Sequence, residues 1–183
     1  MCLFLISIWL IVTGTAFVYA GLYFLNTALF PALVLSAHVS LIFLPSGVRL
    51  IAILLFSHWG ALGIVFGSVL TSLVAPPEDL GPTLAGAWLI SGLAPWLARE
   101  AGIRFLHMDR QLKNLSGTDL LKLSLVFAAC NAVMHQLWFR WQDNSSDFLR
   151  QTWSMAVGDL LGAALLLYAF KFVLAAAERL RRG

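Results

Sequence analysis

The chain has 183 residues, of which 60% are hydrophobic and 11% are charged, and its formal net charge is +3. Soluble globular domains carry about 25% charged residues, so a mean hydropathy of +0.86 with so few charges excludes a soluble domain. We therefore expect an integral membrane protein that is surrounded by the lipid bilayer and has no nucleic-acid partner.

Six apolar runs approach or exceed the length that a membrane span requires. In chain order they are Leu3 to Leu25, Thr27 to Leu44, Val48 to Ala75, Thr83 to Ala98, Leu120 to Trp138 and Trp153 to Ala177. Because backbone groups in lipid must be satisfied internally, and no alternating barrel pattern occurs, the runs are predicted to be helices. The first run has no preceding Lys or Arg and no cleavage signature, which indicates a retained helix and not a signal peptide. The sequence thus predicts an all-α fold, a single domain (residues 1–183) of about six transmembrane helices without a soluble domain.

The second and third runs are separated by Pro45, Gly47 and Arg49 within the stretch FLPSGVRLIAILLF, residues 43–56. We favour a plain turn here, in which Pro45 ends the second helix and Gly47 allows the chain to reverse. Arg49 would then anchor the start of the third helix at the cytoplasmic headgroups.

The alternative is a broken or re-entrant helix near Pro45, which leaves a half-helix facing an internal cavity, as transporters build their sites. The run from Val48 to Ala75 exceeds the ~20 residues that a span needs, and SHWG (residues 57–60) lies near its middle. A second break at that point would fit this alternative.

Basic residues gather around one connection and at the end of the chain. They are Arg99, Arg104, Arg110, Lys113, Lys122, Arg179, Arg181 and Arg182. The connections at residues 75–82 and 142–147 carry acidic and polar residues instead. Since Lys and Arg in short loops stay on the cytoplasmic side, we expect a multi-pass inner-membrane protein with both termini in the cytoplasm.

Polar side chains within the predicted spans are functional candidates, because such groups are costly in hydrocarbon. Asn131 and His135 are four residues apart and share one helix face. At 1.5 Å per residue, His135 and Asp159 each lie roughly 9 Å below the outer ends of their helices. We predict a cluster of Asn131, His135 and Asp159 that binds a ligand or senses protons, with Arg140 above it as a counter-charge. The alternative is that these groups only join helices by hydrogen bonds.

His38 and His58 are weaker candidates, which would meet near the middle of the bilayer. No ligand spacing accompanies them, so neither a metal nor another cofactor is expected. The sequence also lacks a nucleophile elbow, a phosphate loop and paired catalytic carboxylates, which indicates that the protein is not an enzyme.

Glycines spaced four apart occur as Gly63 with Gly67 and as Gly158 with Gly162. Such pairs let helices approach closely, and we favour packing within the chain over a dimer face. The tryptophans mostly fall near predicted helix ends, where they are expected to anchor the chain at the membrane interface.

The order of these motifs is similar to the membrane-associated sensor domain of the first (MASE) type. The similar segments include FLPSGVRLIAILLF, WGALGIVFGSVLTSL and WSMAVGDLLGAALLL, whose shared marks fall on Pro45, Gly47, Gly60, Gly63, Gly67, Gly158, Asp159 and Gly162. This resemblance implies transmembrane helices of the kind found in front of histidine kinases or diguanylate cyclases. The chain ends at ERLRRG, so it is expected to be a stand-alone, shortened relative.

Together these expectations describe a bacterial sensory or ligand-binding module that signals through a membrane or cytoplasmic partner at its basic inner face. The main alternative is a small transport subunit, such as the substrate-binding component of a vitamin-type importer. A scaffold that binds no ligand is the third possibility considered.

Overall fold

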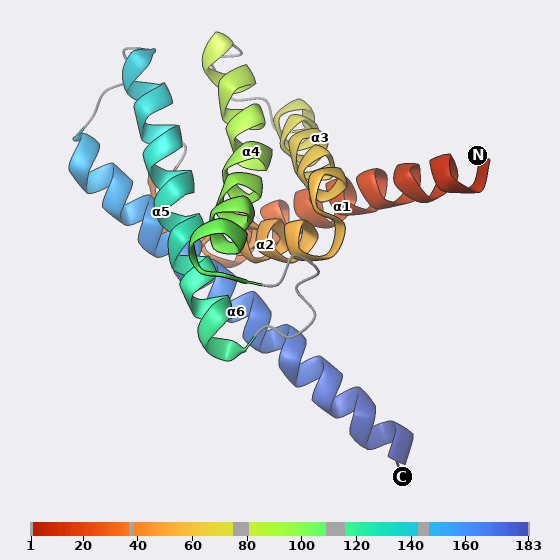
Figure 1. Ribbon diagram of the computed structural model, residues 1–183. Coiled ribbons are helices and arrows are strands. Elements are labelled where there is room, and N and C mark those ends of the chain that lie inside the picture. The colour runs from red at the N-terminus through yellow and green to blue at the C-terminus, as the bar shows by residue number, and fades with distance from the viewer. Residues whose placement is uncertain (1, 37–38, 75–80, 109–115, 143–146, 183) are drawn as a thin grey trace.

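Helices form most of the chain in the computed structural model, which describes residues 2–36, 39–74, 81–108, 116–142 and 147–182 (Figure 1). The helices are α1 (Cys2–Leu29), α2 (Pro45–Phe56), α3 (His58–Val74), α4 (Pro82–Phe105), α5 (Gly117–Trp141) and α6 (Phe148–Arg182). Between α1 and α2 lie a 3-10 turn, η1 (Pro31–Leu33), and two short antiparallel strands, β1 (Val34–Ser36) and β2 (Val39–Ser40).

Within these described ranges, three helices are long and apolar enough to cross a membrane. Their apolar parts are Phe4–Leu29, Gly117–Trp141 and Phe148–Ala169, while α2 and α3 are apolar but shorter. Large apolar side chains such as Trp9, Leu10 and Phe17 are about two-thirds exposed, as expected for a lipid-facing surface. The chain is therefore a membrane protein, and the number of its spans stays a prediction.

The predicted second helix, Thr27 to Leu44, is wrong. Helix α1 ends at Leu29, and Pro31, which lacks a backbone N–H and cannot continue an α-helix, opens the 3-10 turn η1. The chain then passes through the short β1–β2 hairpin instead of crossing as a helix. Hydropathy shows that this segment is apolar but does not report its conformation.

Non-helical backbone between β2 and α2 is held by groups from two other helices. The backbone N–H of Leu44 donates to Asn26 Oδ1 of α1 at 2.9 Å. The backbone N–H of Phe43 donates to the carbonyl oxygen of Gly158 in α6 at 3.1 Å. Irregular backbone is tolerated at membrane depth where protein groups satisfy it in this way.

Pro45 begins helix α2, so the interpretation that it ends a helix at a plain turn is wrong. Proline suits the first helical positions because its missing N–H would have no helical partner there. Gly47 lies within α2, where an added Cβ would come within 2.5 Å of Leu166 Cβ in α6. The long apolar run is broken again at Ser57, whose φ of 50° and ψ of −127° separate α2 from α3. At 12 residues α2 is about 18 Å long, which agrees with the half-helix alternative.

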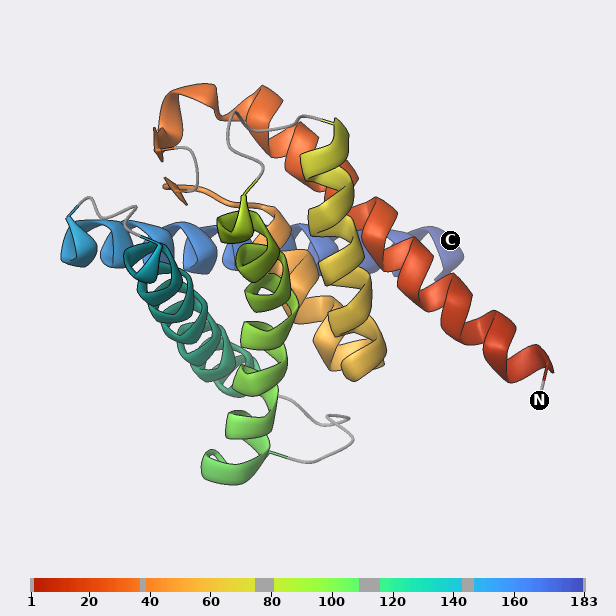
Figure 2. The same ribbon diagram turned by 90° about the horizontal axis from the view of Figure 1, so that it is seen from above.

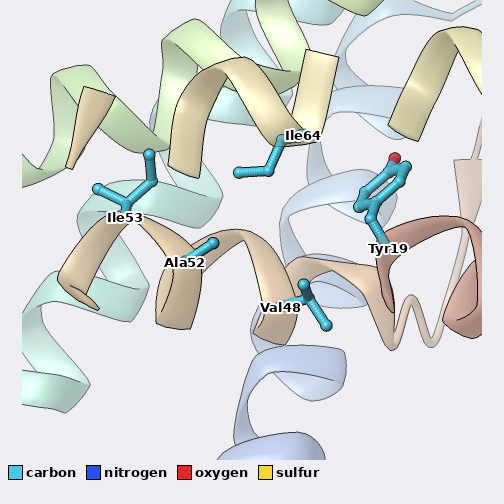
Figure 3. Close-up of a cluster of buried hydrophobic side chains, with 5 residues drawn as sticks. All are labelled: Tyr19, Val48, Ala52, Ile53 and Ile64. Atoms are coloured by element: carbon cyan, nitrogen blue, oxygen red, sulfur yellow. The ribbon is translucent and has the colours of Figure 1, made fainter. Parts of the chain in front are cut away.

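Helix α2 lies at the centre of the molecule and contacts α1, α3, α4 and α6 (Figure 1). Its side chains Val48, Ala52 and Ile53 form a buried cluster with Tyr19 of α1 and Ile64 of α3 (Figure 3). Because other helices surround α2, its side chains lie in the interior of the protein.

The predicted close packing at the α3 glycines is confirmed. An added Cβ at Gly63 would lie 2.5 Å from Thr15 Cβ, and one at Gly67 would lie 2.8 Å from Tyr19 Cδ1. Both partners belong to α1, which contacts α3 and crosses it in the view from above (Figure 2).

Helices α3, α4, α5 and α6 pack in sequence order against their neighbours. The end of α3, the start of α4, the end of α5 and the start of α6 lie toward one end of the bundle (Figure 1). The C-terminal part of α6 projects beyond the other helices (Figure 1).

Candidate functional site

A cavity of about 170 Å³ lies where the six helices meet around the start of α2. One water molecule needs about 10–15 Å³ of such cavity volume, so the cavity has room for several waters or a small solute. Every helix contributes polar side chains to its wall, among them Tyr19, Tyr23, Asn26, Arg49, Ser68, Thr71, Ser91, His135 and Asp159.

Arg49 reaches the cavity from α2 and is 3% exposed. Its Nη2 donates to the hydroxyl of Tyr19 at 2.8 Å and to Ser91 Oγ at 3.1 Å. The guanidinium carbon lies 5.4 Å from the centre of the Tyr19 ring and 5.1 Å from that of Phe43, which is the range of cation–π contacts. Its Nε and Nη1 are buried and have no hydrogen-bond partner among the residues that the structure describes.

The expectation that Arg49 anchors a helix at the headgroups is therefore wrong. It lies one turn inside a half-helix that contacts four other helices, and its side chain is enclosed by protein groups. Hydroxyl groups and aromatic faces replace the water that a headgroup position would supply.

Asp159 reaches the same cavity from α6 and is 1% exposed. Its Oδ2 accepts a hydrogen bond from Asn131 Nδ2 at 2.6 Å. The ring of His135 also lines the cavity, and its Nδ1 lies 3.0 Å from the backbone oxygen of Asn131. The structure thus brings together the three polar residues that the sequence placed in one cluster.

Arg140 does not belong to this cluster, so its predicted role as the counter-charge is wrong. It is exposed and lies over the ring of Phe148, 5.7 Å from the ring centre. Five residues beyond His135, it projects from another face of α5. Arg49 is the basic residue on the cavity wall instead.

Of the two weaker histidine candidates, only His58 is described, and it does not contribute to the site. His58 is exposed, packs against Trp59 with ring centres 4.7 Å apart, and is absent from the cavity wall. His38 lies outside the described residues, so the predicted contact between these histidines stays a prediction.

The glycines of the GDLLG motif allow the backbone that precedes α2 to lie in close contact with α6. An added Cβ at Gly158 would overlap the carbonyl oxygen of Ser40, and one at Gly162 would overlap that of Phe43. Ser46 Oγ, in the first turn of α2, donates to the backbone oxygen of Asp159 at 2.7 Å. The PSG motif (residues 45–47) and the GDLLG motif (residues 158–162) are therefore in direct contact. This contact places Arg49 and Asp159 at the same cavity.

Several wall residues were missed by the sequence reasoning, above all Arg49, Tyr19 and Ser91. The sequence feature that could have identified Arg49 is an arginine inside an apolar run. Under the half-helix alternative, such an arginine is expected to face a cavity. Trp88 was expected to anchor the chain at the interface, but it lines the cavity and its Nε1 donates to Ser72 Oγ at 3.0 Å.

No family model, curated protein or solved structure matches this chain. Among the residues that the structure describes, no group of three or more His, Cys, Asp or Glu side chains is placed to hold a metal ion. The arrangement provides an arginine, a histidine, an aspartate and many hydroxyl groups around a small space, which suits non-covalent binding of a polar solute.

Proposed function

We propose that this protein is a bacterial inner-membrane module that binds a small polar solute in the Arg49–Asp159 cavity and signals its occupancy to a partner, without catalysis. The observation that carries the proposal is Arg49, which is almost fully buried beside the cavity with Nε and Nη1 unbonded. A charged side chain within a membrane protein is costly and usually marks a pathway or a ligand site.

A scaffold without a ligand accounts less well for the cavity. Apolar residues of similar size would pack the helices without the desolvation penalty of buried charges, which amounts to several kcal/mol per ion. A functional reason is therefore needed for Arg49 and Asp159 at one cavity, and solute binding supplies it.

Through the contact between α2 and α6, solute binding could change the packing of the rest of the molecule. Ser46 is tied to the backbone of Asp159, and Arg49 lies one turn further along α2. A solute that contacts Arg49 and Asp159 would bridge the same two helices and change how they pack.

Helix α6 can carry that change to the cytoplasmic side. Its 35 residues span about 52 Å, which exceeds the ~30 Å hydrocarbon core. The sequence at its end is basic, where a partner could bind, and the resemblance to the MASE type of domain supports a sensory role.

Thermal stability of the purified protein tests this proposal. We expect at least one member of a panel of organic acids, sugars, amino acids, polyamines and inorganic ions to raise the melting temperature of the wild type but not that of Asp159→Asn. Arg140→Gln, which removes a charge outside the cavity, should respond as the wild type does. Identical curves for the wild type and Asp159→Asn with every compound would contradict solute binding at this site.

A small transport subunit is a second candidate, and the break at Ser57 between α2 and α3 favours it. Transporters place their sites at such discontinuous helices. Uptake of a stabilising solute into proteoliposomes, with and without a candidate partner ATPase, would distinguish transport from sensing, since a sensor binds without net uptake.

A further inference from the structure

The cavity wall carries two opposite charges that do not neutralise each other by contact. Arg49 and Asp159 are both described, and they form no ion pair with one another. Arg49 uses only Nη2 for hydrogen bonds, to two neutral hydroxyls. The Asp159 carboxyl accepts a hydrogen bond from a neutral amide, that of Asn131. The hydrogen bonds of each charged group are therefore made with neutral groups.

Charge balance restricts what can bind there. A guanidinium stays protonated in proteins, and its charge is matched in number by the single acidic side chain on the described wall. A solute with a net charge would leave one buried charge without a counterpart, which is costly in a low-dielectric interior. The favoured solute therefore has no net charge.

The wall also favours a solute that carries charged groups of its own. A neutral polyol would leave the guanidinium and the carboxyl without ionic partners, whereas a carboxylate accepts strong charge-assisted hydrogen bonds from an arginine. The rings of Tyr23, Trp88 and Phe139, which line the same cavity as Asp159, suit an ammonium group.

From these observations we propose that the solute is a small zwitterion of the free amino acid class. Its carboxylate contacts Arg49, and its ammonium group contacts Asp159. This inference rests on the proposed function, because it names the class of solute for the same cavity.

The test uses the full chain in lipid nanodiscs and compares compounds that differ in net charge. The twenty common amino acids, taurine and glycine betaine are screened by calorimetry and thermal shift. For the tightest amino acid, the N-acetyl derivative (anion) and the carboxamide (cation) are then measured. We expect the zwitterion to bind at least about tenfold more tightly than either derivative, since a buried charge left unpaired costs that much or more.

Two substitutions test which charged end of the solute contacts Arg49 and which contacts Asp159. In Arg49→Gln the preference for the amino acid over its carboxamide should fall at least about tenfold, whereas in Asp159→Asn the preference over the N-acetyl derivative should fall. Arg140→Gln should leave both preferences unchanged. If Arg49→Gln does not fold, the comparison of compounds on the wild type still decides the proposal.

The outcomes separate this inference from the proposed function. Equal binding of a singly charged derivative, or binding only of sugars, organic acids or inorganic ions, would overturn the zwitterion and leave solute binding standing. A panel in which no compound binds would overturn both.

Discussion

Arg49 keeps a positive charge in the interior through two hydrogen bonds and two aromatic faces. Hydrogen bonds to charged groups contribute about 1.5–3 kcal/mol, and a cation–π contact contributes about 0.5–2 kcal/mol. The effective cost of burying such an ion is several kcal/mol, so these contacts offset a large part of it. Tyr19 supplies both a hydroxyl and a ring, which makes it the main support of the arginine.

Asn131 has the corresponding role for Asp159. It donates at 2.6 Å to a carboxyl group that is 1% exposed. Asn131→Ala should therefore lower the free energy of unfolding by about 1–3 kcal/mol, because the carboxyl oxygen loses its donor in the interior. Reversible unfolding by denaturant in mixed micelles measures this change.

Arg140→Gln is the matched control for Asn131→Ala, since it changes an exposed residue on the same helix and should alter stability by no more than about 0.5 kcal/mol. Equal stability of Asn131→Ala and the wild type would show that the Asn131–Asp159 contact contributes nothing to the fold.

At the scale of elements, α6 and the segment that precedes α2 form one unit. Gly158 and Gly162 allow the backbone at Ser40 and Phe43 to lie against the helix surface, and the Phe43 N–H bonds to Gly158. This contact fixes where α2 begins and hence where Arg49 enters the cavity.

Gly158→Ala should disrupt this unit, because the new methyl group would overlap the Ser40 carbonyl, which is backbone and cannot rotate away. We expect a loss of about 1–3 kcal/mol of stability, as is typical of overpacking, together with weaker solute binding. Thermal unfolding and the solute screen measure the two effects.

Gly14→Ala and Gly21→Ala are the controls for the glycine prediction, since an added Cβ at either position meets nothing within 4 Å in α1. Both should be neutral or slightly stabilising, because alanine favours helix more than glycine does. A Gly158→Ala protein as stable as these controls would mean that the segment moves aside without cost.

The contact between PSG and GDLLG also shows what the sequence could predict and what it could not. The apolar runs predicted α1, α5 and α6, and helical spacing with depth counting grouped Asn131, His135 and Asp159, because these are properties of a single helix. The conformation of the segment between α1 and α2 could not be predicted from hydropathy, because hydropathy does not report whether the backbone is helical.

Arg49 was assigned to the wrong place for a related reason. An arginine beside an apparent helix end looks like a headgroup anchor, and its true partners, Tyr19 and Ser91, lie 30 and 42 residues away along the chain. Only the tertiary arrangement of the half-helix distinguishes a buried arginine from an anchoring one.

At the scale of the whole molecule, the helix ends separate the connections into two groups. The helix ends that flank the α3–α4 and α5–α6 connections lie toward one end of the bundle (Figure 1), and the sequences of these connections are acidic and polar. The α4–α5 connection joins the other ends of its helices, and its sequence is basic. This arrangement supports the proposed topology, in which the basic connection faces the cytoplasm.

Cysteine labelling in intact cells tests that topology in a background in which Cys2 and Cys130 are replaced by serine. Asp147→Cys, at the start of α6, and Thr118→Cys, at the start of α5, are both exposed positions near opposite ends of α5. We expect a membrane-impermeant maleimide to label Asp147→Cys in intact cells and Thr118→Cys only after permeabilisation. The opposite pattern would invert the orientation and place the basic connection outside, whereas labelling of both positions in intact cells would show that α5 does not cross the membrane.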